Sequence, residues 1–407
     1  MARIPHGLLL SFEGLASTVF QSQVLSTAAW LQRQGIASFD VVSFAISPKL
    51  FATSSRNLAS LNAAPEISVR LKLGVRPFLP GSVAVNRMLV ARLLRGKRYD
   101  FIQARTDYAA AVAGPLARRR GLPLVWDCRG DSEAEFRYRA TQKGWPRPIT
   151  EARSRALVAL SEKAAEFSNA AIFVTEALRQ RRASRLGGQP AAVIPCIVDT
   201  DRFYFDPELR ARTRRQLGFG EEETVFVYSG SLGPYQGFDN ALQFYKDLEG
   251  AHPRRLLILT PEVDVASALV EQAQVPGARV LCASFEEMNA YLNAADVAVM
   301  LRPRAALNDV AFPTKFAEFG AAGLGVVLND SLPACMDAAR AGGNLLDPKG
   351  PVEEPRSINQ KMKIASFYRG HYSHSAFAES YRAIYESLFE CHNLSSHPEN
   401  STPAAAR

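Results

Sequence analysis

Long apolar runs are missing from this 407-residue sequence. None reaches the roughly 18 to 20 residues that span a bilayer, and the opening MARIPHGLLLSFEG holds too short an apolar segment for a signal peptide. Cysteine is scarce as well. The five cysteines are scattered without C-x-x-C spacing, which is typical of reduced thiols and not of a disulfide or zinc framework. We therefore expect a cytoplasmic protein.

Two further signals are missing. The sequence has no G-x-G-x-x-G fingerprint of dinucleotide-binding proteins, and no aromatic-basic interleaving typical of nucleic-acid binding. Of its six histidines, four stand at positions 371, 374, 392 and 397, in the terminal region, where a solvated role is more common than catalysis. We expect no nucleic-acid partner.

Positive charge is in excess, with a net charge of +8. Basic residues cluster in the first half, at 92–98, 118–120 and 137–155. A basic face indicates an anionic partner, such as an acidic acceptor or the inner face of a membrane in peripheral contact, whereas a solvated surface is the commoner explanation of charge runs. Both interpretations stay open.

Short apolar runs alternate with helical-period segments along the chain, the pattern of parallel sheets covered by helices. Because 407 residues exceed what one core usually supports, we predict an α/β protein with two doubly wound, Rossmann-like domains. One long helix is predicted from Thr18 to Gln34. Strands are predicted at 7–12, 39–44, 67–73, 101–103, 122–126, 171–174 and 192–194 in the first half, and at 224–228, 255–259, 279–282, 297–301 and 325–328 in the second.

The domain boundary is placed at residue 198, where a short apolar strand ends and the polar segment DTDRFYFDP precedes a charged helix. We predict a first domain over 1–198, a second over 199–372, a closing helix over 373–391 that returns to the first domain, and a disordered tail over 392–407.

In parallel sheets, ligands bind beyond the carboxyl ends of the strands, so the loops there carry the candidate site. In SFEGLAST, Gly14 lets the backbone approach a ligand, although a plain turn needs a glycine equally often. In WDCRGDSEAE, Asp127 and Arg129 favour a polyhydroxylated or charged substrate; the alternative is a structural arginine neutralised by Asp127.

Two loops of the second half add candidates. YSGSLGPYQGFDN sets Gly230, Gly233 and Gly237 around a strand-to-helix connection, which suits either a backbone cradle for a sugar or phosphate or a simple Gly-Pro turn. MLRPRAALNDVAF adds Arg302 and Arg304, whose guanidinium groups either clamp a diphosphate or face solvent.

The segment AFPTKFAEFGAAGLGVVL carries the strongest signal. Pro313 fits the first position of a helix, which sets Lys315 and Glu318 three residues apart on one face. Free N–H groups at the helix start favour a phosphate, Lys315 adds a point charge, and Glu318 accepts hydrogen bonds from ribose hydroxyls. An ordinary surface ion pair is the alternative.

Together these segments resemble the family-4-type retaining glycosyltransferases of the GT-B fold, from the first strand to the last long helix. The likeness is carried, in order, by FEGLASTVFQSQVLSTAAWLQRQG, VIPCIVDTDRF, VFVYSGSLGPYQGFDNAL, SFEEMNAYLNAADVAVMLRP and FPTKFAEFGAAGLGVVL. Each segment is moderately specific, and their order and spacing strengthen the resemblance.

The resemblance implies two domains facing a central cleft. A nucleotide-sugar co-substrate, a UDP- or GDP-sugar, would bind the second domain, and a glycan or lipid-linked acceptor of cell-surface polysaccharide synthesis would bind the first, with no metal or other cofactor. Glu318 matches the family glutamate that binds the donor ribose, Lys315 lies where the diphosphate is expected, and Gly14 matches the loop that faces the phosphates. Apart from the resemblance, the loops above predict Gly230, Ser231, Gly233, Gln236, Arg302 and Thr314 as further donor-binding residues, and Lys315, Asp127 and Arg129 as catalytic residues.

The sequence departs from the family pattern in three ways. The first glutamate of E-x7-E would fall at Val310, the loop cations of many members are replaced by Ser231 and Gln236, and the first-domain histidine is not evident. Lys315, Arg302 or Arg304 would then have to stabilise the negative charge of the leaving group. A non-catalytic nucleotide-sugar-binding scaffold and a nucleotide-sugar epimerase of the same architecture remain alternatives.

Overall fold

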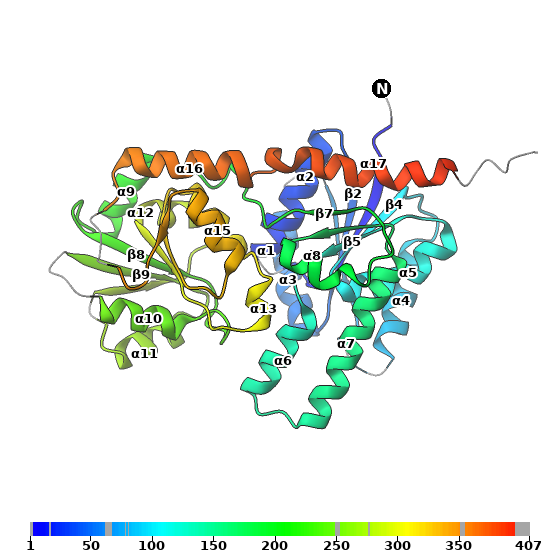
Figure 1. Cartoon of the computed structure of the whole chain (residues 1–407), viewed down its shortest axis with the longest axis horizontal. Helices are drawn as coiled ribbons and strands as arrows, with labels where there is room; N and C mark the ends of the chain where they lie inside the picture. The colour runs from blue at the N-terminus through cyan, green and yellow to red at the C-terminus, as the bar shows by residue number, and fades with distance from the viewer. Residues whose placement is uncertain are drawn as a thin grey trace, which may run out of the picture.

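Two β-sheets of parallel strands, each flanked by helices, lie side by side along the long axis of the molecule (Figure 1). The structure, a computed structural model, describes residues 3–15, 18–61, 67–77, 79, 81–248, 253–275, 277–350 and 355–394. In this part of the chain, no helix combines the length and the apolar character that crossing a membrane requires.

The first sheet has seven strands in the order β3-β2-β1-β4-β5-β6-β7, and all its pairings are parallel. Most of these strands are buried apolar runs, because helices cover both faces of the sheet. The strands are β1 His6–Ser11, β2 Ser38–Ala45, β3 Ser68–Leu73, β4 Phe101–Arg105, β5 Leu124–Cys128, β6 Ala170–Phe173 and β7 Ala191–Val193.

The second sheet repeats this topology with six strands in the order β10-β9-β8-β11-β12-β13. In both sheets the strand order reverses beside the first strand, which leaves a crevice at the carboxyl edge where doubly wound proteins bind ligands. The strands are β8 Thr224–Ser229, β9 Arg254–Leu259, β10 Ala278–Leu281, β11 Val297–Met300, β12 Gly325–Leu328 and β13 Leu345–Leu346. The two-domain, doubly wound prediction is confirmed, although β13 was not predicted.

The helix predicted from Thr18 to Gln34 is divided in three. A π-helix, η1 Gln21–Leu25, separates α1 Thr18–Phe20 from α2 Ser26–Arg33. Within η1, Gln23 donates to the Ile197 carbonyl at 2.8 Å and accepts from Arg129 at 3.2 Å, so the wider turn coincides with a polar side chain held by two other segments.

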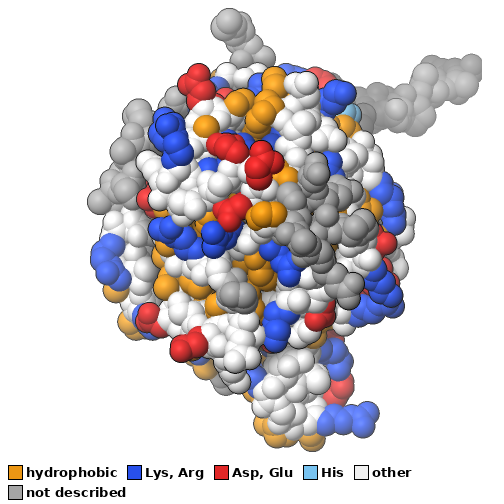
Figure 2. Space-filling view, turned by 90° about the vertical axis from the view of Figure 1, so that its left-hand side faces the viewer, with side chains coloured by type: hydrophobic (Ala, Val, Ile, Leu, Met, Phe, Trp, Pro, Cys, Tyr) orange, Lys and Arg blue, Asp and Glu red, His pale blue; other side chains and the backbone are white. Residues whose placement is uncertain are grey.

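The remaining helices connect the strands and cover the sheets. They are α3 Pro48–Leu61, α4 Ser82–Leu93, α5 Asp107–Arg120, α6 Ser132–Gln142, α7 Arg147–Phe167, α8 Glu176–Ala183, α9 Pro207–Leu217, α10 Phe238–Asp247, α11 Val263–Gln272, α12 Met288–Ala294, α13 Ala306–Asp309, α14 Thr314–Ala321, α15 Pro333–Ala341, α16 Ile358–Tyr372, the 3-10 helix η2 Ser375–Phe377 and α17 Ala378–Leu394. The α6–α7 hairpin projects from the body of the molecule and forms the lobe at the lower end of Figure 2.

The last two helices run along one side of both sheets (Figure 1). α16 packs on α14 of the second sheet's layer, and α17 contacts β6 and β7 of the first. There Tyr385 donates its hydroxyl hydrogen to Gln103 Oε1 at 2.7 Å. The returning helix is therefore confirmed. It continues to Leu394, beyond the predicted start of the tail at residue 392, and residues 395–407 lie outside the described part.

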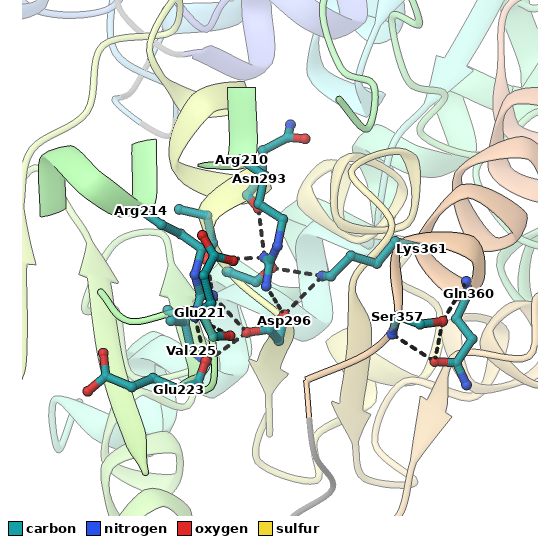
Figure 3. A network of polar contacts seen from close by, with 12 residues as sticks. Arg210, Arg214, Glu221, Glu223, Val225, Asn293, Asp296, Ser357, Gln360 and Lys361 are labelled. Carbon is teal, nitrogen blue, oxygen red and sulfur yellow. Dashed lines mark hydrogen bonds and ion pairs between the residues drawn. The ribbon is translucent and has the colours of Figure 1, made fainter. Parts of the chain in front are cut away.

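One buried carboxylate ties the two ends of the second domain together (Figure 3). Asp296 accepts from Arg210 at 2.7 Å and from Arg214 at 3.1 Å, both on α9, and Lys361 of α16 lies 3.3 Å away. Arg210 and Lys361 also donate to the backbone carbonyl of Ala295, whereas Arg214 Nε is buried without a hydrogen-bond partner. Because Asp296 precedes β11, this network lies at the amino edge of the sheet, opposite the candidate site, and its role is structural.

Candidate functional site

Lys315 lies against the glycine loop at the carboxyl end of β8. Its ammonium group donates to the Ser229 carbonyl oxygen at 2.5 Å and to Gln236 Oε1 at 3.0 Å. Helix α14 begins at Thr314, with Pro313 at the N-cap and not at the first helical position as predicted. The helix start, the lysine and the glycine loop therefore meet at one place, as a phosphate site requires.

Arg302 is the second cation here and is only 5% exposed. It donates to the same Gln236 Oε1 at 2.8 Å and to Asn308 Oδ1 at 3.3 Å, so the Gln236 amide holds both cations. With both terminal nitrogens engaged, Arg302 acts through its charge and its hold on Gln236 and does not offer an open bidentate clamp. Arg304 lies apart, exposed and paired with Asp330.

In the described part of the chain the two cations of this cluster form no ion pair with a carboxylate, although the charge of Glu318 partly offsets the lowering of the Lys315 pKa. Among the ion pairs of the described residues, none involves Lys315 or Arg302, and Arg302 Nε is buried without a hydrogen-bond partner. Burial, reinforced by Arg302, lowers the pKa of Lys315 to about 7, and burial raises the pKa of Glu318 to about 7. An anion bound beside Lys315 would raise the pKa of this lysine again, since an opposite charge favours the protonated ammonium form.

The glycines of the loop are required by its geometry. Gly230 has φ +138°, and a Cβ there would strike the Lys315 ammonium group; Gly237 has φ +76°, and a Cβ there would overlap the Leu301 carbonyl oxygen. The loop is fixed further by a hydrogen bond from Gln236 N to the Gly233 carbonyl at 2.8 Å and by one from the Tyr228 hydroxyl to the Ser231 carbonyl at 2.7 Å. The glycines at these two positions thus leave room for the Lys315 ammonium group and for the Leu301 carbonyl.

The first-domain candidates form a separate cluster at the carboxyl edge of their own sheet. Asp127 and Arg129, both about one-tenth exposed, pair at 3.2 Å. Arg105 lies 3.6 Å from Asp127 and pairs with Glu13 at 2.7 Å. The pKa of Arg129 is raised, although burial lowers it, because Asp127 lies beside it. The structural pairing of Asp127 and Arg129 is therefore present, and Glu13 is the most exposed member of the cluster.

Gly14 follows Glu13 in this edge loop. It has φ +69°, its N–H donates to the Phe44 carbonyl at 3.3 Å, and its own carbonyl accepts from Ser43 at 3.0 Å. Glu13 and Arg105 were not predicted as site residues. The signal available for Arg105 was a charged residue at the end of an apolar run, which is unusual unless a partner neutralises the charge.

The first domain also contacts the second. Tyr138 of α6 donates to the Pro234 carbonyl at 3.3 Å, and the Arg139 guanidinium lies 5.5 Å from the Tyr235 ring centroid. Thr175 donates to the carbonyl of Val310 at 2.8 Å. The side chain of Val310 is buried, whereas the neighbouring Asp309 is exposed. The glycine loop and the position expected for the first family glutamate thus lie at the junction of the two domains.

Two family models match the chain in succession. Glycosyltransferase Family 4 matches residues 21–202, and Glycosyl transferases group 1 matches residues 210–366. The two halves of the chain are therefore glycosyltransferase domains, one of Family 4 and one of group 1. This glycosyltransferase is also 30% identical over 151 residues to a GDP-mannose-dependent alpha-(1-6)-phosphatidylinositol monomannoside mannosyltransferase of Mycolicibacterium smegmatis, a match that spans 37% of the chain and only 35% of that enzyme.

Solved structures support the GT-B fold. Sucrose-phosphate synthase from Thermosynechococcus elongatus superposes with a TM-score of 0.69 at 14% identity, covering 95% of this glycosyltransferase and all of that chain. Anabaena HepE in complex with UDP-glucose superposes with a TM-score of 0.63 at 17% identity, covering 97% of this glycosyltransferase and all of that chain. WaaG, a glycosyltransferase involved in lipopolysaccharide biosynthesis, superposes with a TM-score of 0.57 at 14% identity, covering 97% of this glycosyltransferase and all of that chain. At these identities the likeness shows the fold alone.

Proposed function

We propose that this glycosyltransferase moves a sugar from a nucleotide-sugar donor to a glycan or lipid-linked acceptor, with retention of configuration and without a metal, in cell-surface polysaccharide synthesis. The observation that carries the proposal is the unpaired cation cluster of Lys315 and Arg302 at the start of α14. Departure of a nucleoside diphosphate builds negative charge on the leaving oxygens, and preorganised cations and backbone dipoles stabilise that charge.

In this mechanism the second domain, residues 199–372, binds the donor. The N–H groups of Thr314 and Lys315 and the loop from Gly230 to Gly237 surround the diphosphate, and Glu318 accepts from the ribose hydroxyls. Burial favours protonated Glu318, and its ionisation would strengthen the hydrogen bonds that it accepts from the ribose hydroxyls. UDP- and GDP-sugars are the proposed donors, since a UDP-glucose complex and a GDP-mannose-dependent enzyme stand among the similar proteins.

The first domain, residues 1–198, binds the acceptor in this proposal. Glu13, Asp127 and Arg129 line its carboxyl edge, where hydroxyl groups of a sugar find acceptors and donors. Asp127 and Arg129 orient the acceptor and hold each other in place. Tyr138 and Arg139 close the first domain over the glycine loop, which limits access of water to the donor.

The experiment combines donor screening with product analysis. Thermal unfolding is measured with UDP, GDP, CDP, ADP and their sugars, since a ligand at a hundred times its dissociation constant adds about 2.7 kcal/mol of stability. The stabilising donor is then incubated with and without acceptor, and the anomeric configuration of the product is determined. Transfer with retention supports the proposal. Binding without transfer or hydrolysis indicates a non-catalytic scaffold, and conversion of the donor without acceptor indicates an epimerase.

A further inference from the structure

Four side chains of alternating charge follow one another along the carboxyl edge of the first sheet. Arg105, at the end of β4, donates through Nε to Glu13 Oε2 at 2.7 Å, and its Nη1 lies 3.6 Å from Asp127 Oδ2. Asp127 in turn pairs with Arg129 at 3.2 Å. Because β4 lies between β1 and β5 in the sheet, Arg105 holds carboxylates from the segments on both sides of its own strand.

The four side chains differ in burial. Those of Arg105, Asp127 and Arg129 are 4%, 10% and 11% exposed, whereas that of Glu13 is 38% exposed. The Ser11 hydroxyl also donates to Glu13 Oε2 at 3.2 Å, so this oxygen is held from two sides and the orientation of the carboxylate is set. The two cations are therefore turned into the protein, and the charge that reaches the surface is negative.

Glu13 lies where doubly wound sheets bind ligands. The strand order reverses between β1 and β4, and Leu10 of β1 is in register with Ala104 of β4. Glu13 and Arg105, which follow these two residues, therefore flank the crevice at the carboxyl ends of the strands. Thr106, next to Arg105, has φ +80°, a backbone conformation that costs about 1 to 3 kcal/mol and persists where the surrounding contacts fix it.

The basic clusters of the sequence lie away from this crevice. Residues 92–98 and 118–120 come shortly before β4 and β5, so they lie at the amino edge of the sheet, where these strands begin. On the projecting α6–α7 hairpin, Arg137 pairs with Glu151 at 2.9 Å. The clusters over 92–98 and 118–120 therefore do not face the acceptor, and the acidic partner that they indicated is not the sugar bound at the crevice.

We propose that the acceptor unit bound at this crevice is a neutral sugar, selected by Glu13, and that Arg105 is the positioning residue of Glu13. The carboxylate accepts a hydrogen bond from a sugar hydroxyl, and it repels a carboxylate or phosphate group brought to the same place. Arg105 does not offset that repulsion at the surface, because its side chain is buried behind Glu13. The inference rests on the proposed function and names the substrate class of its acceptor site.

The test compares matched neutral and acidic acceptors. With the donor that the unfolding screen selects, transfer by the full chain is measured to the methyl α-glycosides of mannose, glucose and galactose and to those of the corresponding uronic acids, which differ by a carboxylate at C6. We expect kcat/KM for the best neutral glycoside to exceed that for its uronic acid by at least about tenfold, since like charges placed together cost several kcal/mol. E13Q, which removes the charge and keeps the shape, is expected to abolish most of this preference.

The positioning role of Arg105 is tested by R105Q. This variant is expected to raise the KM for the neutral glycoside by about tenfold, because the carboxylate loses its fixed orientation, and to leave the affinity for the nucleoside diphosphate unchanged. R105K, which keeps the positive charge, is expected to restore part of the loss. A merely structural role would instead lower stability without a selective change in the acceptor KM.

Arg70 of β3 provides the matched control in the same sheet. It pairs with Asp40 at 2.7 Å and, like Arg105, has one buried nitrogen without a hydrogen-bond partner. R70Q is expected to leave the acceptor KM and the preference for neutral glycosides unchanged. Equal effects of R70Q and R105Q, equal use of neutral and acidic glycosides by the unmodified protein, an unchanged preference in E13Q, or no transfer to any glycoside of the panel would overturn the proposal.

Donor and acceptor binding are also scored separately, by thermal unfolding with nucleotides and by saturation-transfer NMR with the glycosides. A nucleotide that stabilises the protein, without discrimination between neutral and acidic glycosides, refutes the acceptor proposal alone. Binding of neutral glycosides that depends on Glu13, while no nucleotide binds, refutes the proposed donor site alone. Thermal unfolding of each variant without ligand verifies that the substitutions leave the fold intact.

Discussion

Lys315 is expected to make donor binding depend on pH. Its pKa in the free protein is lowered to about 7 by burial and by Arg302, and a bound diphosphate raises that pKa, so binding takes up a proton above pH 7. The affinity for the nucleoside diphosphate is therefore expected to fall by about tenfold per pH unit above 7.5. Isothermal titration at pH 7.5 and 8.5 measures it.

Glu318, whose pKa is raised to about 7 by burial, is ionised over that range and adds no opposing trend. The control is K315R, because a guanidinium group stays protonated at these pH values. Its affinity is expected to be flat between pH 7.5 and 8.5. A flat profile in the unmodified protein would show that Lys315 does not contact the diphosphate.

Gly237 is the glycine of the loop that tolerates substitution least. With φ +76° and the Leu301 carbonyl where a Cβ would lie, G237A is expected to lower the unfolding free energy by more than the roughly 1 to 2 kcal/mol of a left-handed alanine. The control is G233A, whose Cβ would have its nearest neighbour, Ser231 Oγ, at 3.7 Å. Urea unfolding compares the two, and equal stabilities would contradict this geometry.

At the residue scale, sequence patterns predicted the members of the donor cluster but not their contacts. Lys315, Gln236 and Arg302 come from three segments, and only the folded sheet shows that one amide oxygen holds both cations. Glu13 and Arg105 were missed because they lie 92 positions apart in the chain. Their pairing depends on β1 and β4 being neighbours in the sheet, which no local pattern reports.

Asp296 links helices α9 and α16 to the start of β11 through buried ion pairs. D296N leaves Arg210, Arg214 and Lys361 buried without their shared carboxylate, and removal of one partner of a buried ion pair typically costs about 3 to 5 kcal/mol. We expect a loss of that order in urea unfolding of the second domain. D337N, which removes a carboxylate 77% exposed, is expected to change stability by less than about 1 kcal/mol. Equal effects of the two variants would contradict the structural role.

At the element scale, the prediction of strands succeeded because buried parallel strands are apolar runs between helical segments. The strand β12, for example, occupies the predicted residues Gly325–Leu328. Two elements were not predicted from the sequence. β13 has only two residues, Leu345–Leu346, too few for any periodicity, and the π-helix η1 depends on contacts of Gln23 with distant segments.

At the scale of the whole molecule, the two similar sheets present their carboxyl edges to a common junction, which α6 and the glycine loop bridge. The order of the segments in the sequence predicted this architecture. The roles of the two edges in binding donor and acceptor are proposals, and they rest above all on one cluster in the second domain.

The most direct test of the donor site is the kinetics of K315A with the nucleotide sugar that screening identifies. Removing one preorganised donor from a developing oxyanion typically costs roughly 2.7 to 4 kcal/mol, so kcat/KM is expected to fall by at least about a hundredfold. K246A, which removes an exposed lysine of α10 in the same domain, is expected to retain full activity. Near-normal turnover by K315A would contradict the assignment of the diphosphate to Lys315.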